Sequence, residues 1–133
     1  MTRYLLDTNI VSDLVKNPGG RAAARVSDVG DRNVVTSIIV AAEIRFGLAK
    51  RPSASLLAQT EAVLGGLAIL PFEQPAEEAY GALRADLESR GRPIGANDMF
   101  IAAHALALRC TLVTDNVREF SHVRSLVIEN WLR

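Results

Sequence analysis

The sequence contains a single cysteine and no long hydrophobic run. Cys110 therefore has no partner for a disulfide within the chain, and its apolar surroundings are typical of a small buried side chain. No apolar segment approaches the length that spans a bilayer, and the apolar stretch in MTRYLLDTN is too short for a secretory signal peptide. These absences argue against a disulfide scaffold and a membrane protein, and we expect a cytoplasmic location.

The chain also lacks an excess of charge of either sign. Fifteen lysines and arginines balance fifteen aspartates and glutamates, so no field of the whole molecule attracts a polyanion, and nucleic-acid binding needs a local patch. Only two histidines are present: His104 lies in an apolar segment, where we expect a core residue, and His122 is expected at the surface. Chemistry that relies on paired catalytic histidines is therefore disfavoured.

What the sequence does contain is an alternation of short apolar segments with helical patterns. We expect strands at residues 4–6, 34–36, 68–70 and 111–114, and helices at 9–16, 21–29, 38–50, 54–65, 74–90 and 99–110. This alternation predicts an α/β fold in which helices sandwich a parallel central sheet, with ligands at the carboxyl ends of the strands. The length and the absence of a linker predict one domain, residues 1–133.

Acidic residues occupy positions that local propensity does not require. Asp7 ends the first predicted strand, and Asp115 and Asn116 follow the fourth. Asp98 precedes an apolar helix, and Glu43 lies inside the apolar segment SIIVAAEIRFG. A doubly wound sheet would bring the strand-end residues to one edge.

Each acid also has an ordinary structural explanation. Asp7 fits a turn or a helix cap, and Asp98 fits the N-cap of its helix. Glu43 fits an ion pair with Lys50 or Arg51 one to two turns further on, or a place at the solvent boundary. The aspartate–asparagine pair after the fourth strand is a good turn former. Four independent explanations would be needed to account for the whole set.

If these carboxylates converge, they repel one another. Repulsion raises their pKa values unless a divalent cation is present, and hard oxygen ligands favour Mg²⁺ or Mn²⁺. Such a centre can bind a phosphate oxygen and lower the pKa of a water, with a second ion possible about 3.5 to 4 Å away. The pattern therefore predicts metal-dependent phosphodiester hydrolysis.

Four segments together resemble the PIN-domain family and, within it, the VapC toxins of bacterial toxin–antitoxin pairs. They are LLDTNIVSDLV, SIIVAAEIRFGLAK, GANDMFIAAHALALRCTLVTDNVREF and the closing VIENWL, and they cover nearly the whole chain. The resemblance implies a Rossmann-like α/β/α sandwich and a Mg²⁺-dependent endoribonuclease in which Mn²⁺ can substitute. Structured tRNA is the implied substrate, with initiator tRNA the expectation for close relatives.

The resemblance also implies roles for individual residues. Asp7 and Asp98 match the principal metal ligands of the family, and Glu43 matches the acid that holds the metal or orients its water. Asn116 matches the family's usual fourth position, and Asp115, one residue earlier, is expected close enough to assist as a further metal ligand. We expect all five to form the catalytic site.

The family comparison further implies partners. These are a cognate VapB-type antitoxin, which inserts a basic side chain among the carboxylates, and a second copy of the toxin in a homodimer. An acidic pocket is complementary to arginine or lysine, which gives the antitoxin a physical reason to bind there. Candidate phosphate contacts for the RNA are Arg3, Arg45, Arg90, Arg92 and Arg118, although a solvated surface charge is the ordinary explanation of any one of them.

Other functions fit less well. A haloacid-dehalogenase-like phosphatase needs a second aspartate where this chain has Asn9, and a dinucleotide-binding domain needs a glycine-rich turn after the first strand. The strongest rival is a catalytically weak PIN scaffold that only binds RNA or an antitoxin, and metal affinity would separate it from an enzyme. Asp86, on a helix expected at the surface, is predicted to be insensitive to neutralisation.

Overall fold

A five-stranded parallel sheet forms the centre of the computed structural model, which describes residues 2–133. The strand order is β3-β2-β1-β4-β5, and every neighbouring pair is parallel. This confirms the predicted parallel sheet. The strands are β1 (Tyr4–Leu6), β2 (Val34–Ser37), β3 (Ala68–Leu70), β4 (Thr111–Val113) and β5 (Ile128–Glu129).

The six predicted helices are present, and their ends shift by a few residues. The fifth begins after the Gln74-Pro75 pair, and the sixth begins at Ala96, three residues earlier than predicted, with Gly95 as its N-cap. The helices of residues 2–133 are α1 (Thr8–Lys16), α2 (Arg21–Val29), the 3-10 turn η1 (Asp31–Asn33), α3 (Ile38–Lys50), α4 (Ala54–Gly65), α5 (Ala76–Ser89), α6 (Ala96–Leu108) and α7 (Val117–Phe120).

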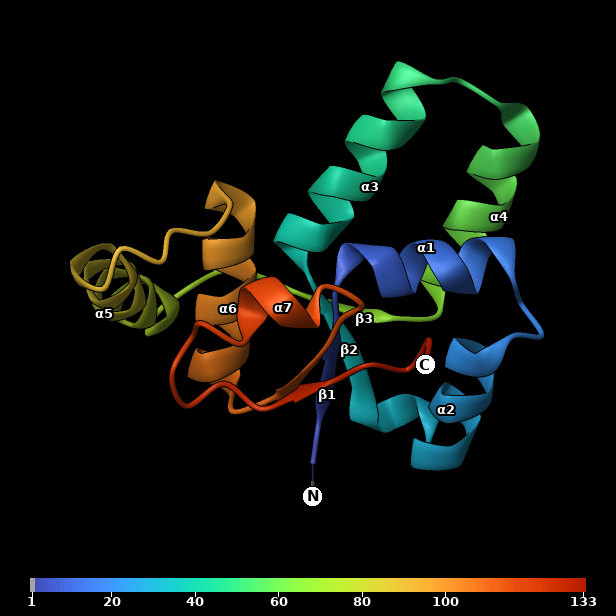
Figure 1. The fold of residues 1–133 in the computed structure, drawn as a ribbon. Helices are drawn as coiled ribbons and strands as arrows, with labels where there is room; N and C mark the ends of the chain where they lie inside the picture. Colours follow the sequence, from blue (N-terminus) through green and yellow to red (C-terminus); the bar gives the residue numbers. More distant parts are fainter. Residues whose placement is uncertain (1) are drawn as a thin grey trace.

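The strand order sets which helices cover each face. The chain moves from β1 to β2 to β3 in one direction across the sheet, and then from β3 to β4 to β5 in the other. Because parallel crossovers are right-handed, α1 to α4 belong to one side and α5 to α7 to the other, as Figure 1 shows for α1, α2 and α4 against α5 and α6. The direction reverses between β1 and β4, which makes their carboxyl ends the point where such sheets bind ligands.

Strands β1, β2 and β4 are paired in register near this point. Leu6 pairs with both Thr36 of β2 and Val113 of β4, and the Asp7 N–H donates to the Val113 carbonyl at 2.9 Å. The residues that follow, Asp7 and Thr114, are therefore next to each other at the carboxyl edge.

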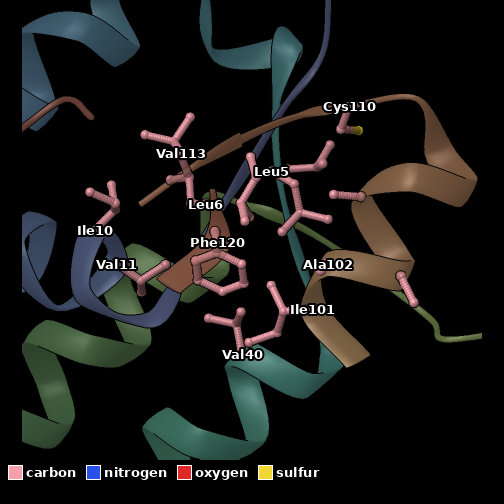
Figure 2. Packing of buried hydrophobic residues seen from close by; sticks show 14 of the residues in the cluster. Leu5, Leu6, Ile10, Val11, Val40, Ile101, Ala102, Cys110, Val113 and Phe120 are labelled. Atoms are coloured by element: carbon pink, nitrogen blue, oxygen red, sulfur yellow. The ribbon is translucent and has the colours of Figure 1, made fainter. Parts of the chain in front are cut away.

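Apolar side chains from both helical layers hold this edge in place. Figure 2 shows Phe120 of α7 packed near Val11, Val40 and Ile101, and all four are fully buried. Phe120 thus anchors the four-residue helix α7 to the core, which fixes the position of its neighbour Glu119. His104 is 1% exposed, which confirms the predicted core histidine. Within residues 2–133 no helix has both the length and the apolar character needed to cross a membrane.

Candidate active site

Asp7 lies buried at the carboxyl end of β1, where it is 4% exposed. It is also the N-cap of α1: its carboxylate accepts the Thr8 N–H at 2.8 Å and the Thr114 hydroxyl at 2.7 Å. The Asn9 amide lies 3.4 Å from the same carboxylate. Burial raises the pKa of Asp7, while the bonds from Thr114 and Thr8 oppose this rise. Asp7 is therefore the helix cap that the sequence suggested. Its carboxylate also lies at the edge of the sheet where folds of this topology bind ligands.

Glu43 reaches the same edge from α3. The Thr8 hydroxyl donates to one of its carboxylate oxygens, and the Asn97 amide donates to the other at 3.3 Å. In the described part of the chain it makes no ion pair with Lys50 or Arg51, so that explanation of Glu43 is wrong. Thr8 thus links Glu43 to the turn that carries Asp7.

Asp98 lies in the first turn of α6, inside the helix and not at its N-cap. Its carboxyl forms a hydrogen bond with Glu119 of α7. Burial, this bond and the charges of Glu119, Asp7 and Glu43 together raise the pKa of Asp98 to about 8. The pKa of Glu119 moves down, chiefly because the protonated Asp98 donates to it, so the two carboxyls share one proton that Asp98 holds.

Glu119 is the acid that sequence reasoning missed. Its carboxylate accepts the Gly95 N–H at 2.8 Å, where α6 begins, and the side-chain amide of Asn116. The available signal was the segment DNVREF, because Glu119 follows Asn116 by about one helical turn. The structure therefore gathers Asp7, Glu43, Asp98 and Glu119 from four separate elements.

Asp115 does not join this group, contrary to expectation. Its carboxylate accepts the Asn130 amide at 2.9 Å and lies 3.4 Å from the Arg133 guanidinium, and these contacts lower its pKa. Only its backbone faces inward, where its N–H donates to the Asn9 side chain at 3.0 Å. Asn116 lies beside the group as predicted, but it acts through Glu119, whose carboxylate its amide orients.

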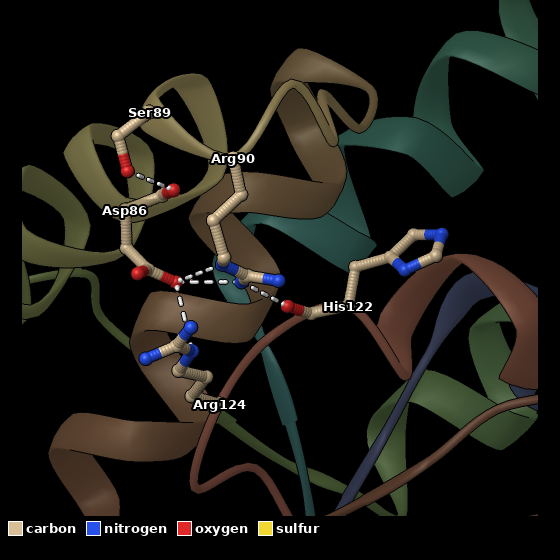
Figure 3. A network of polar contacts seen from close by, with 5 residues as sticks. All are labelled: Asp86, Ser89, Arg90, His122 and Arg124. Atoms are coloured by element: carbon tan, nitrogen blue, oxygen red, sulfur yellow. Dashed lines mark hydrogen bonds and ion pairs between the residues drawn. The ribbon is translucent and has the colours of Figure 1, made fainter.

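A network on the far side of α7 holds that helix against α5. The Arg90 guanidinium donates to the Asp86 carboxylate and, at 2.6 Å, to the His122 carbonyl just after α7. Figure 3 shows Asp86 between Arg90 and Arg124, whose Nε lies 3.7 Å from the carboxylate. Asp86 is therefore half-buried in the polar network that links α5 to the segment after α7. The prediction that Asp86 is insensitive to neutralisation needs revision.

The four carboxylates suit a divalent cation by their chemistry. Within residues 2–133 no three acidic, histidine or cysteine side chains stand close enough to coordinate one ion as placed. Hydrogen bonds to Thr8 and Asn97, and the proton shared by Asp98 and Glu119, satisfy the carboxylates individually. The oxygen donors are nevertheless those that Mg²⁺ and Mn²⁺ prefer, and a cation would offset the burial and the repulsion that raise the pKa of Asp98. The residues thus fit a metal in donor type and charge.

The predicted phosphate contacts are scattered. Arg3 precedes β1 and so lies at the opposite edge of the sheet, and Arg45 forms an ion pair with Glu61 of α4. Arg92 and Arg118 are exposed, and neither makes an ion pair in the part of the chain that the structure describes. No single surface unites these arginines with the carboxylates.

A doubly wound parallel sheet with acidic side chains at the point where its strand order reverses defines a structural class of protein. Comparison with known sequences places the chain in a family of this class. The chain belongs to the PIN domain family, whose model matches residues 4–126. It is 36% identical to Ribonuclease VapC2 of Rickettsia felis, over 96% of this chain and 97% of that protein. It is 31% identical to the tRNA(fMet)-specific endonuclease VapC of Shigella flexneri, over 98% and 99%.

Solved structures give the same result for the fold. The crystal structure of VapBC2 from Rickettsia felis, bound to a DNA fragment from its promoter, matches with a TM-score of 0.90 at 32% identity, over 98% of this chain and 99% of the other. The α/β sandwich that the sequence predicted is therefore confirmed.

Proposed function

We propose that this chain is a VapC-type endoribonuclease, the toxin of a toxin–antitoxin pair, and that it hydrolyses phosphodiester bonds of tRNA. One observation carries the proposal: carboxylates from the β1–α1 junction, α3, α6 and α7 lie near one another at the reversal point of the sheet. The full-length similarity to proteins named ribonuclease and tRNA endonuclease supports the choice of RNA.

Each residue of the group has a distinct task. Asp7, Asp98 and Glu119 would hold Mg²⁺ or Mn²⁺, which supplies Lewis acidity toward a phosphate oxygen. Thr114 and the Thr8 N–H fix the orientation of Asp7. Glu43, held by Thr8 and by one long bond from Asn97, accepts the proton of the attacking water at a carboxylate oxygen. Asp98 would hold the cation as the carboxylate, with its proton released to water.

The decisive experiment is cleavage of unfractionated tRNA by purified, antitoxin-free protein with Mg²⁺ or Mn²⁺. We expect discrete fragments, no fragments in EDTA, and a loss on the order of 100-fold for Asp98→Asn. Asp28→Asn is the matched control, because Asp28 is an exposed acid of α2.

The possible results separate the alternatives. Equal cleavage by Asp98→Asn and wild type would contradict the site, and equal cleavage in EDTA would contradict the metal. Binding of tRNA without any cleavage by the wild type would favour the PIN scaffold that only binds.

We also propose a cognate antitoxin that inserts a basic side chain among the carboxylates. Among the matched structures is VapBC-5 from Mycobacterium tuberculosis, a member of the VapBC family of toxin–antitoxin systems, at 26% identity. Burial, and to a smaller extent the neighbouring carboxylates, raise the pKa values of Asp7 and Asp98, and an arginine or lysine would offset both effects by stabilising the charged forms. The homodimer stays a prediction.

A further inference from the structure

Three adjoining pockets lead from the carboxylates around the C-terminal end of α1. The first, about 380 Å³, lies between α1, α3 and α4 and extends from Glu43 to Lys16 and Arg51. Lys16 also lines the second, about 530 Å³, together with Arg21 of α2. Arg21 in turn lines the third, about 250 Å³, which ends at Arg133. Each pocket shares a lining residue with the next, so the three adjoin, and together they are called here the α1 groove.

Basic side chains dominate the α1 groove. Lys16, Arg21 and Arg51 are exposed, and among residues 2–133 none of them forms an ion pair. Arg25 and Arg133 also line it, each with one partly exposed carboxylate partner, Glu129 and Asp115 respectively.

Few acids oppose these cations. Besides Glu43, the only acid that lines the groove in the described part of the chain is Asp13, and its carboxylate accepts the Asn17 amide. In a chain without net charge, this is a local excess of positive charge that starts at the catalytic group.

The position of the groove matches what the proposed reaction needs. A polyanion is repelled by the four carboxylates, so its affinity must come from cations beside them. Lys16 is eight residues beyond Thr8 on α1, about 12 Å along the helix axis, and Thr8 contacts Glu43. Figure 1 shows α4 on one side of α1 and α2 beyond its far end, and residues of these helices line the groove together with α1.

We infer that the α1 groove holds the sugar–phosphate backbone of the RNA on one side of the cleaved bond, with Lys16, Arg21 and Arg51 contacting phosphates. This inference rests on the proposed ribonuclease function. It moves the main phosphate contacts from the arginines suggested by the sequence to α1, α2 and the end of α3. The apolar wall formed by Ile44 and Leu48 leaves room for a sugar or base between the phosphate contacts.

The test measures the binding of labelled, unfractionated tRNA to proteins that all carry Asp98→Asn, so that cleavage does not interfere. Lys16→Glu and Arg21→Glu should each weaken binding about tenfold and reduce the slope of log affinity against log salt by about one. Arg32→Glu is the matched control: it makes the same charge change on an exposed residue of η1, which precedes β2 at the opposite edge of the sheet. Lys16→Gln, a milder change, should give a smaller loss in the same direction.

The outcomes separate this inference from the function beneath it. One outcome is that Lys16→Glu, Arg21→Glu and Arg32→Glu bind tRNA with equal affinity while circular dichroism shows all three folded. That result would overturn the inference that the α1 groove binds RNA, and it would leave the proposed ribonuclease function standing. A loss of tRNA affinity in Lys16→Glu and Arg21→Glu but not in Arg32→Glu would support the groove. It would do so even if the wild type failed to cleave tRNA, because that failure would contradict only the proposed ribonuclease function.

Discussion

Glu119 and Asp115 lie four residues apart, yet their carboxylates point to different surroundings. Glu119 bonds to Gly95, Asn116 and Asp98, whereas Asp115 bonds to Asn130 and Arg133. Proximity to the end of β4 in sequence is therefore a poor guide to which side chain faces the site.

This contrast gives a prediction for the two acids. Glu119→Gln should reduce tRNA cleavage on the order of 100-fold and weaken Mn²⁺ binding, because it removes one of four converging carboxylates. Asp115→Asn should retain most of the activity, since only its backbone N–H reaches Asn9. Cleavage rates and Mn²⁺ titrations of both variants check this. The reverse order of sensitivity would restore Asp115 to the site.

Three of the four acids at the candidate site could be identified from the sequence, and the reason is physical. Asp7 and Asp98 adjoin apolar segments of clear periodicity, and Glu43 is the only acid in the largely apolar segment SIIVAAEIRFG, so each is conspicuous. Glu119 belongs to a four-residue helix, too short for a periodic pattern. Its key partner, Gly95, is 24 residues away in sequence and adjacent only after folding.

At the scale of elements, α7 depends on its anchors. Four residues cannot form a stable helix alone, so α7 is held by buried Phe120 and by the bond from Arg90 to the His122 carbonyl. Arg90 is in turn oriented by Asp86. These contacts make Arg90 a positioning residue for Glu119.

We therefore predict that Arg90→Ala lowers the melting temperature by a few degrees and weakens Mn²⁺ binding, because α7 loses its tie to α5. Arg90→Lys should recover part of both, since it restores the charge but not the two-pronged contact with Asp86 and His122. Arg84→Ala, which removes an exposed ion pair within α5, is the control. Normal metal binding by Arg90→Ala would show that Phe120 alone positions α7.

At the scale of the whole molecule, the alternation of strands and helices predicted the parallel sheet and its helical layers. It did not predict β5, which has two residues at the sheet edge, or α7, which has four. Both are too short to carry a hydrophobic period, and both form because the core provides a place for Phe120 and because Leu112 and Val113 of β4 pair with β5. Long, periodic elements are thus readable from sequence, while short ones depend on tertiary contacts.

The four carboxylates also tie the stability of the whole fold to pH. The pKa of Asp98 is raised from 3.8 to about 8 in the folded protein. Between these values the folded protein keeps a proton that the unfolded chain releases, so this group lowers the free energy of unfolding as the pH rises. The loss begins near pH 4 and is complete above about pH 8.

Comparison of the wild type with Asp98→Asn isolates this effect, because the other titrating groups are common to both. In EDTA, the melting temperatures should be similar at about pH 4, and the wild type should fall below the variant at about pH 8.5, where Asp98 is charged while still buried among other carboxylates. The proposed cation would bind the folded protein alone, so Mg²⁺ should raise the wild-type melting temperature most at the higher pH and that of Asp98→Asn least. A wild type that stays the more stable of the two in EDTA at high pH would mean that the carboxylates do not crowd one another, and the electrostatic argument for a cation at this edge of the sheet would fail with it.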